Sequence, residues 1–500
     1  MHTNTNVDAI GDEHLEPLLR AAPWMSRDAR EADRYVCVDH VAAGPRELLL
    51  VVAAEGGPAS GRRFFVPVRR QEPSGALTHA HADGDGNGGL AAVRQVPSGA
   101  RLRTARGGVV AFRSADPAPA GEVRRLPFEQ GWSSNALSLV EIGGVPHIHK
   151  TYRHLDETIR EPELLRLMSG TGHTPQWAGD YTYTDPVHGT RHPLGVVYRY
   201  APGHGLDVPL RENLRSLWPR LTAADQAAPD RLVRSHLRPL EEKLRAAGAF
   251  LRAFHRDLSA RLGAPATGYP VGGALPRAAA RLAELARADA PLPRAPRNAA
   301  FAALEAELAA LRSVFGDRAT APGAGPCHGD LHLSHLLCGA GPADAPHGHW
   351  SLRVIDLSTP ALTPGEPGYA AQSPLQDLVA VQRALEYFTA DEAAFESARR
   401  LGVDASETMN GSLDGAPGWP PARRTVLAGV FRTADAWREH VVRLLLGPAS
   451  DSPLRRLLYV RRLLHELGYN HDHARPYHAA IDLRHALALA SPAPTTHART

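Results

Sequence analysis

The sequence predicts an α+β fold in which β-rich segments precede a large helical lobe. Short runs rich in Val, Leu, Tyr and Phe, separated by Gly and Pro turns, occupy the chain before about residue 205. Beyond that point, long segments place apolar residues at i, i+3, i+4 and i+7. A chain of 500 residues exceeds a single core, so several domains are expected.

Residues 1–122 are predicted to form a β-rich N-terminal cap domain. The strand-like runs within residues 35–69 are YVCVDHV, ELLLVVAAE and RRFFVPVRR. Residues 71–122 are polar and rich in Gly, Pro and Ala, and we expect them to form a long, low-complexity loop or linker. The histidines of this loop, in THAHADGDGNGGL, are expected to be solvated rather than to bind a metal.

Residues 123–204 are predicted to form a second strand-rich region that carries one helix. NALSLVEIGG and VPHIHKTY are expected to pair as a hairpin through the Gly-Gly turn. IREPELLRLMSG has helical spacing and an acidic first turn, and WAGDYTYTD and PLGVVYRYAPG again resemble strands.

Residues 205–500 are predicted to form the helical lobe. Its clearest helices are LEEKLRAAGAFLRAFHRDLSARL, RAAARLAELARA and NAAFAALEAELAALRSVFG, with breaks at TGYPVGGALP and RADAPLPRAP. A short strand is expected at 351–356 and a loop at 410–421.

Composition narrows the classes of function. The net charge of +3 argues against nucleic acid as a partner. Three cysteines cannot form a disulfide framework, no secretory signal is recognised, and no apolar run is long enough to span a membrane. We therefore expect a soluble cytoplasmic protein without a membrane partner, acting as a monomer or homodimer.

CHGDLHLSHLL, followed by VIDLS, contains the residue types that phosphoryl transfer requires. Such a reaction needs a carboxylate for the attacking hydroxyl and ligands for a metal ion on the phosphates. Asp330 fits the first role. Asp356, at the end of an apolar strand, and His335 fit the second.

Lys150 is the candidate cation for the α- and β-phosphates. The chain has only two lysines, Lys150 and Lys243, so arginine has replaced lysine almost everywhere else. Glu163 or Glu161, on the helix that follows, would hold Lys150 in place.

These segments resemble the aminoglycoside-phosphotransferase-like kinases. HGDLHLSHLL is similar to their catalytic loop, H-G-D-x-H-x-x-N/Q, and VIDL to their I-D-F segment. Within that superfamily the sequence most resembles maltokinase and the related glucosamine kinases. Further likeness lies in LLLVVA, FFVPV, SSNALSLV, HKTYRHL, LGVVYRYAPGHG and LLHELGYNHDHARPYHAAIDL. The resemblance implies a bilobal protein-kinase-like fold with an N-terminal cap domain, and ATP and Mg²⁺ as cofactors.

By position, Asp330 resembles the catalytic base and Asp356 the chief Mg²⁺ ligand. His335 stands where the family has Gln or Asn, and imidazole suits Zn²⁺ or Mn²⁺ better than Mg²⁺. DLSTPAL lacks the acidic residue and glycine that usually follow I-D-F, and RPY replaces R-P-x-W. These departures indicate an acceptor other than simply maltose.

Further site residues are expected in the strand-rich lobe and near the end of the chain. SSNALS is a candidate phosphate-facing turn, and the segment from Tyr198 to Gly203 is a candidate hinge for adenine. The nucleotide-binding candidates are Lys150, Glu163, Ser133, Ser134, Asn135, Ser138, Tyr198 and Tyr200. The acceptor candidates, which suit a sugar or amino sugar, are Glu466, Tyr469, Asn470 and Arg475.

Several alternatives stay open from the sequence. Cys327, His328, His332, His335 and Cys338 would supply the ligands of a zinc site, or of a zinc-dependent hydrolase. In the kinase interpretation the cysteines are packing residues and the histidines before His335 brace the loop.

Asp377 is expected to cap a helix rather than orient the catalytic loop, and His255 to be a satisfied core histidine. The overall prediction is an ATP-dependent kinase acting on a hydroxyl of a sugar or amino sugar, glucosamine- or maltose-like. The alternative is a catalytically weak, kinase-like nucleotide-binding regulator.

Overall fold

The chain folds as two units, Met1–Ala201 and Pro202–Thr500. The computed structural model describes residues 12–71, 77–79, 90–130, 135–263, 265, 267–288, 294–340, 350–358, 366, 368–447 and 452–490. The division falls between Ala201 and Pro202, inside the segment from Tyr198 to Gly203 that was predicted as a hinge. Pro202 has no amide hydrogen, and Gly203 has a φ of 140°, so regular structure is interrupted there.

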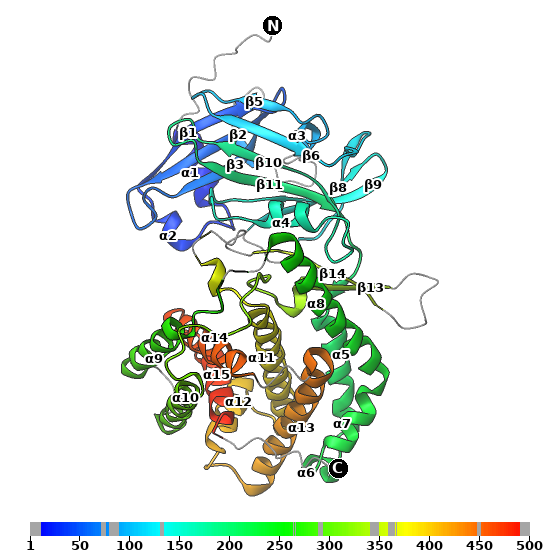
Figure 1. The fold of residues 1–500 in the computed structure, drawn as a ribbon, viewed down its shortest axis with the longest axis vertical. Helices are drawn as coiled ribbons and strands as arrows, with labels where there is room; N and C mark the ends of the chain where they lie inside the picture. Colours follow the sequence, from blue (N-terminus) through cyan, green and yellow to red (C-terminus); the bar gives the residue numbers. More distant parts are fainter. Residues whose placement is uncertain are drawn as a thin grey trace. The chain divides into compact units, whose positions relative to one another are not determined.

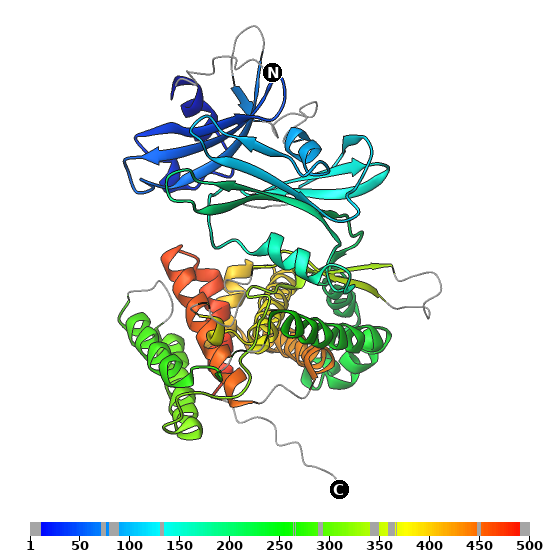
Figure 2. The same ribbon diagram turned by 45° about the horizontal axis from the view of Figure 1, so that its top comes forward.

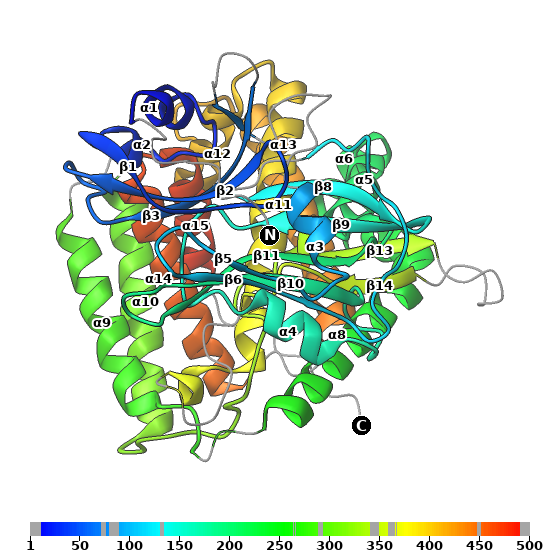
Figure 3. The same cartoon turned by 90° about the horizontal axis from the view of Figure 1, so that it is seen from above.

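The first sheet of the first unit is buried on both faces. Its antiparallel strands, in order, are β1 (Arg34–Ala42), β2 (Glu47–Glu55), β3 (Arg63–Arg70) and β4 (Leu77–His79). Leu48 and Leu50 pack with Leu15 of α1 (Asp12–Arg20), which lies beside β1 in Figure 3. Leu49 and Val51 belong to a different core, shared with the second sheet. Burial of both faces explains why β2 is apolar along its length.

The second sheet of this unit has seven strands in the order β5-β6-β10-β11-β9-β8-β7. The strands are β5 (Arg101–Arg103), β6 (Val109–Ser114), β7 (Val123–Leu126), β8 (Ala136–Ile142), β9 (Val145–Thr151), β10 (Trp177–Thr184) and β11 (Arg191–Arg199), and the helices of the unit after α1 are α2 (Arg27–Arg30), α3 (Leu90–Gln95) and α4 (Glu161–Met168). The predicted hairpin is confirmed as β8 and β9. Gly143 and Gly144 have φ of 58° and 82°, the positive values that a tight hairpin turn requires.

The prediction of one long loop over 71–122 is wrong for the described residues of this segment, because β4, α3, β5 and β6 all lie there. Leu90, Val93, Val110 and Phe112 are at most 3% exposed and join the core between the two sheets. These apolar runs are short and lie among Gly, Pro and Ala, so composition hid their periodicity. The predicted domain border after residue 122 falls within the second sheet, between β6 and β7. The Gly-rich stretch at 80–89 lies outside the described residues.

The second unit is helical apart from one small sheet, as predicted. Its helices are α5 (Asp207–Leu217), α6 (Ala223–Ala227), α7 (Asp230–Leu237), α8 (Glu241–Leu262), α9 (Val271–Arg287), α10 (Arg294–Phe315), α11 (Pro374–Leu401), α12 (Ala405–Asp414), α13 (Pro421–Leu446), α14 (Pro453–Asp472) and α15 (Pro476–Ala488). The sheet consists of β12 (His204–Gly205), β13 (Leu336–Ala340) and β14 (Trp350–Val354), in that order. The strand predicted at 351–356 is therefore confirmed as β14. Within this unit α11 lies between α13 and α14 (Figure 1).

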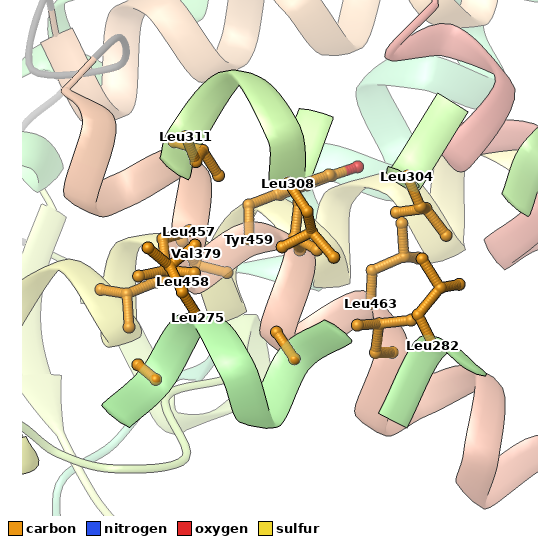
Figure 4. Packing of buried hydrophobic residues seen from close by; sticks show 14 of the residues in the cluster. Leu275, Leu282, Leu304, Leu308, Leu311, Val379, Leu457, Leu458, Tyr459 and Leu463 are labelled. Atoms are coloured by element: carbon orange, nitrogen blue, oxygen red, sulfur yellow. The ribbon is translucent and has the colours of Figure 1, made fainter. Parts of the chain in front are cut away.

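The main core of the helical unit joins α9 and α10 to α14. Leu275 and Leu282 of α9 meet Leu308 of α10 and Leu457 and Leu463 of α14 (Figure 4), and Figure 2 shows α9 and α10 running beside α14 and α15. Burial of each such leucine contributes about 1.5–3 kcal/mol. Within the described part of the chain, no helix has the length and apolar character needed to cross a membrane.

Two helix boundaries differ from prediction. α9 begins at Val271, inside the expected break, because Val271 and Ala274 are fully buried against the core. α12 extends through residues 410–414 of the expected loop. Asp404 accepts the N–H of Ser406 as its N-cap, and Gly415, with a φ of 77°, ends it.

Candidate active site

Asp377 of α11 fixes the backbone of the loop that carries Asp330. Its Oδ2 accepts the N–H of His328 at 2.7 Å, and its Oδ1 accepts the N–H of Gly329 at 3.0 Å. His255 of α8 places Nε2 2.7 Å from the same Oδ2. Asp377 is fully buried, so these bonds to a carboxylate are strong and costly to lose. The loop is thereby held rigidly against α8 and α11.

The expected helix-capping role of Asp377 is therefore wrong. The N-cap of α11 is Ser373, whose hydroxyl accepts the N–H of Leu375, and Gln376 completes the capping box. Asp377 lies one position further into the helix and faces the loop.

His328 braces the loop from the other side, as expected. Its Nε2 donates to the carbonyl of Ile355 at 2.9 Å, so its Nδ1 is left to accept the N–H of Asp330 at 3.3 Å. The ring is completely buried. Because Ile355 follows β14 and precedes Asp356, this imidazole joins the two segments that carry the candidate chemistry.

Asp330 presents a charged carboxylate that is about half exposed, at 49%. His332 Nε2 lies 3.1 Å from Oδ1, and Arg462 of α14 lies 3.4 Å from the same oxygen. Burial alone would raise the pKa of Asp330. The hydrogen bond from His332 and the positive charge of Arg462 outweigh that effect, so the pKa of Asp330 lies well below its usual range. His332 thus contacts the carboxylate instead of bracing the backbone. A carboxylate this acidic orients a hydroxyl well and accepts its proton only late in a reaction.

His335 and Asp356 form a pair of donors next to Asp330. His335 Nδ1 donates to the Asp330 carbonyl at 3.0 Å, which leaves Nε2 with its lone pair, 3.4 Å from Asp356 Oδ2. Burial lowers the pKa of His335 by more than Asp356 raises it, so the ring is neutral at neutral pH. Asp356 has a φ of 60°, a left-handed conformation that costs energy outside glycine. A lone pair and a carboxylate held this close suit a shared cation.

These donors fit a divalent cation bound together with a nucleotide. Within the described ranges, no three His, Cys, Asp or Glu side chains gather as a potential metal-binding group. Two protein donors leave positions for phosphate oxygens and water, as Mg²⁺ prefers, whereas structural zinc takes four protein ligands.

Cys327 and Cys338 are both 1% exposed, and burial raises the pKa of each thiol. They are packing residues.

Glu161, not Glu163, holds Lys150 in the first unit. Lys150 Nζ lies 2.7 Å from Glu161 Oε2, with side chains 7% and 5% exposed, and Tyr152 donates its hydroxyl to the same oxygen at 2.8 Å. Glu163 lies near Arg113 instead, at 3.7 Å. Two positions along a helix are about 200° apart around its axis, so both carboxylates cannot face Lys150.

Strand pairing shows which of the remaining nucleotide-binding candidates lie on the same face of the second sheet as Lys150. Ser133 and Ser134 lie outside the described residues. Strand pairing sets Lys150 opposite Leu137, so Ser138, the next residue of β8, points to the other face, where it is 3% exposed. Ser138 therefore does not share a site with Lys150.

Of the three further candidates, Tyr198 is placed relative to Lys150 by strand pairing, and Tyr200 and Asn135 have backbone hydrogen bonds. Tyr198 pairs with Ile148 and so lies on the face of Lys150. Tyr200 donates its N–H to Pro146 at 2.9 Å. The carbonyl of Asn135 accepts the side-chain amide of Gln130 at 2.7 Å.

Two of the acceptor candidates form part of a buried ion network. Glu466 accepts Nε of Arg383 at 2.7 Å and Nε of Arg462 at 2.6 Å. Asn470 donates to Asp482 Oδ2 at 2.9 Å. These contacts join α11, α14 and α15, so Glu466 and Asn470 have structural partners already. Glu466 reaches Asp330 only through Arg462.

The other two acceptor candidates lie at the far end of α14. Tyr469 is 44% exposed and stacks on His473, with the guanidinium of Arg475 over its ring. Arg475 and Asn470 line an apolar cavity with Leu467 and Leu483. None of the lining residues of this cavity belongs to the catalytic loop.

An open pocket of about 230 Å³ lies beside the loop that carries Asp330, and the sequence analysis missed most of the residues that line it. They are Gly329, Gln376, Val379, Leu458, Arg461, Arg462 and His465. Arg461, Arg462 and His465 lie on α14, before the acceptor candidates in sequence. A signal was present, because Arg461, Arg462 and His465 group three basic residues within about one turn of α14, and Glu466 is spaced i, i+4 from Arg462.

Comparison with known proteins finds matches only among solved structures. No family model and no curated protein matches the sequence. A glucosamine kinase (crystal form B) is 18% identical, with a TM-score of 0.53 over 95% of this chain and 99% of that chain. A glucosamine kinase in complex with glucosamine, ADP and inorganic phosphate is also 18% identical, with a TM-score of 0.49 over 94% and 97%. An aminoglycoside phosphotransferase is 12% identical, with a TM-score of 0.33 over 74% and 94%.

At this level of identity the likeness shows the fold alone. The chain has the bilobal, protein-kinase-like fold that the sequence predicted, with additional β structure at its N-terminal end, and it is similar in fold to glucosamine kinase.

Proposed function

We propose that the chain is an ATP-dependent kinase that phosphorylates a hydroxyl of a sugar or amino sugar. The observation that carries this proposal is the position of the Asp330 carboxylate. Its half-exposed carboxylate stands on a loop fixed by Asp377 and His328, next to the donor pair of His335 and Asp356. Phosphoryl transfer needs these groups: a carboxylate that orients the nucleophile and donors for a cation on the phosphates.

In the proposed reaction the acceptor hydroxyl donates a hydrogen bond to Asp330. Its oxygen forms a bond to the γ-phosphorus of ATP, while the bond from that phosphorus to the β–γ bridging oxygen breaks and ADP leaves with the electron pair. The hydroxyl proton passes to Asp330 as the bond to phosphorus forms. Lys150, held by Glu161, would neutralise the α- and β-phosphates.

Asp356 and His335 would hold Mg²⁺ or a related divalent cation. When bound, the ion supplies positive charge to the phosphate oxygens during transfer. His335 contributes a neutral nitrogen whose direction is fixed by its bond to the Asp330 carbonyl.

The proposal is tested by ADP release from ATP and Mg²⁺ in the presence of glucosamine, glucose and maltose. We expect acceptor-dependent release by the wild type and a loss of at least about a hundredfold in kcat for Asp330→Asn. Asp472→Asn serves as the matched control, since its carboxylate is 62% exposed and away from the loop. Equal turnover by Asp330→Asn would refute the assignment.

The imidazole of His335 supports a second candidate, a nucleotide-binding protein with weak transferase activity. Nitrogen ligands suit Mn²⁺ better than Mg²⁺. We expect the ratio of kcat/KM with Mn²⁺ to that with Mg²⁺ to be higher in the wild type than in His335→Gln. Tight ATP binding without transfer to any acceptor, under either metal, would favour the second candidate.

A further inference from the structure

The pocket beside Asp330 has a cationic wall. Arg461, Arg462 and His465 of α14 supply it, facing Gln376 and Val379 of α11 and Gly329 of the catalytic loop. Of these lining residues only the two arginines carry a fixed charge. The balance of charge in the pocket therefore depends on how each guanidinium is paired.

Arg462 is already balanced by carboxylates. Its Nε donates to Glu466 at 2.6 Å, and its terminal nitrogens lie 3.4 Å and 3.5 Å from Asp330 Oδ1. It therefore serves as a positioning residue between the ion network of α11 and the catalytic carboxylate. An acceptor does not need to neutralise it.

Arg461 is different, because its partner is neutral. Its guanidinium donates to the hydroxyl of Tyr269 and lies 6.0 Å from the centre of that ring. Among the carboxylates of the described residues, none lies within ion-pair distance of Arg461. The side chain is partly buried, and burial lowers the pKa of Arg461 without any charged group opposing that shift. A partly desolvated cation of this kind favours an anionic ligand.

We propose that the acceptor of this kinase is an acidic sugar, whose carboxylate or phosphate binds Arg461 while one of its hydroxyls meets Asp330. This inference rests on the proposed kinase function and names its substrate class. The anionic group takes no part in the bond changes: the hydroxyl oxygen still attacks the γ-phosphorus, ADP leaves, and the proton goes to Asp330. An amino sugar is disfavoured, because its ammonium would face the unbalanced guanidinium.

The test compares four acceptors that share one ring: glucose, glucosamine, glucuronate and glucose 6-phosphate. With the wild type, ATP and Mg²⁺, we expect kcat/KM for at least one acid to exceed that for glucose by about tenfold or more. The preferred acid distinguishes a carboxylate site from a phosphate site.

Variants of Arg461 assign the preference to this side chain. Arg461→Gln should lower kcat/KM for the acid by about tenfold while changing that for glucose by less than about twofold, and Arg461→Lys should keep most of the preference. Arg399→Gln, at a side chain that is 69% exposed on α11, is the matched control. Thermal unfolding of each variant shows whether it folds, and Arg461→Lys keeps the comparison available if Arg461→Gln does not.

The outcomes separate this inference from the function on which it rests. A preference for glucose or glucosamine over both acids overturns the acidic-sugar inference but leaves a sugar kinase. An equal loss on all acceptors in Arg461→Gln also overturns it, because the residue would then support structure alone. Transfer to none of the four acceptors, and none to maltose in the same assay, contradicts the kinase function itself.

Discussion

The side chain of Asp377 shows how one buried carboxylate prepares a site that it does not enter. It binds two consecutive amides of the loop that carries Asp330 and the ring of His255, so three segments of the chain meet at its two oxygens. The sequence did not reveal this role, because a carboxylate in the first turn of a helix also suits a cap. Only the contacts of its carboxylate with the loop amides and with His255 of α8 distinguish the two roles.

Replacing Asp377 with Asn should damage both stability and activity. The NH₂ of asparagine would face a loop N–H, so two donors would meet, and the charged oxygen that accepted that N–H would be lost. This loss should lower the free energy of unfolding by about 1.5–3 kcal/mol. The loop then loses its fixed geometry, and we expect kcat to fall by at least about tenfold. Urea unfolding and ADP release measure the two effects, with Asp472→Asn as control. A variant that matches the wild type in both would show that Asp377 does not hold the loop.

At the scale of single residues, the sequence predicted which loop and strand-end residues lie together better than it predicted their long-range contacts. Asp330, His335 and Asp356 lie close together in the chain, within one loop and one strand end, so a local motif was enough to group them. Arg462 contacts Asp330 across 132 positions of sequence, and no local pattern predicts such a pairing. The residues that surround an acceptor therefore needed the tertiary fold.

At the scale of elements, the orientation of α4 determines which glutamate forms the ion pair with Lys150. Glu161 in the first turn meets β9, whereas Glu163 turns toward Arg113. We expect Glu161→Gln to raise the KM for ATP by about tenfold, because Lys150 loses its ionic partner. Glu163→Gln is the natural control and should leave KM within about twofold. Equal effects of the two substitutions on KM would contradict the assignment.

The network that joins α11, α14 and α15 should give stability a dependence on pH. Arg383 is fully buried and meets three carboxylates, Glu386, Glu466 and Asp482. Burial raises the pKa of Asp482 to about 7, against about 3.9 for an aspartate in an unfolded chain. Between about pH 3.9 and about pH 7, Asp482 keeps its proton in the folded protein but has released it in the unfolded chain. The free energy of unfolding therefore decreases as pH rises through this range.

Asp482→Asn should remove that dependence. The variant keeps a neutral side chain of the same shape, so its unfolding free energy should fall less than that of the wild type between about pH 5 and about pH 7. Urea titrations of both proteins at these pH values give the difference. A difference between the two proteins that does not change with pH would mean that Asp482 is ionised throughout.

At the scale of the whole molecule, the order of β and helical regions followed from periodicity, because long amphipathic helices and Val-rich strands have clear repeats. Three of the elements that were missed, α3, β5 and β6, are short and surrounded by Gly, Pro and Ala. They are stabilised by the core between the two sheets rather than by their own sequence. Likewise, β7 and β6 belong to one sheet although a domain border was expected between them.

The central claim is that Asp330 directs the γ-phosphoryl group of ATP to a hydroxyl. Mass spectrometry of the acceptor after incubation with ATP, Mg²⁺ and the full-length protein tests it most directly, because it separates transfer from hydrolysis. We predict an acceptor heavier by one phosphoryl group with the wild type and with Asp472→Asn, and none with Asp330→Asn. The same phosphorylated product formed at the same rate by Asp330→Asn would contradict the account.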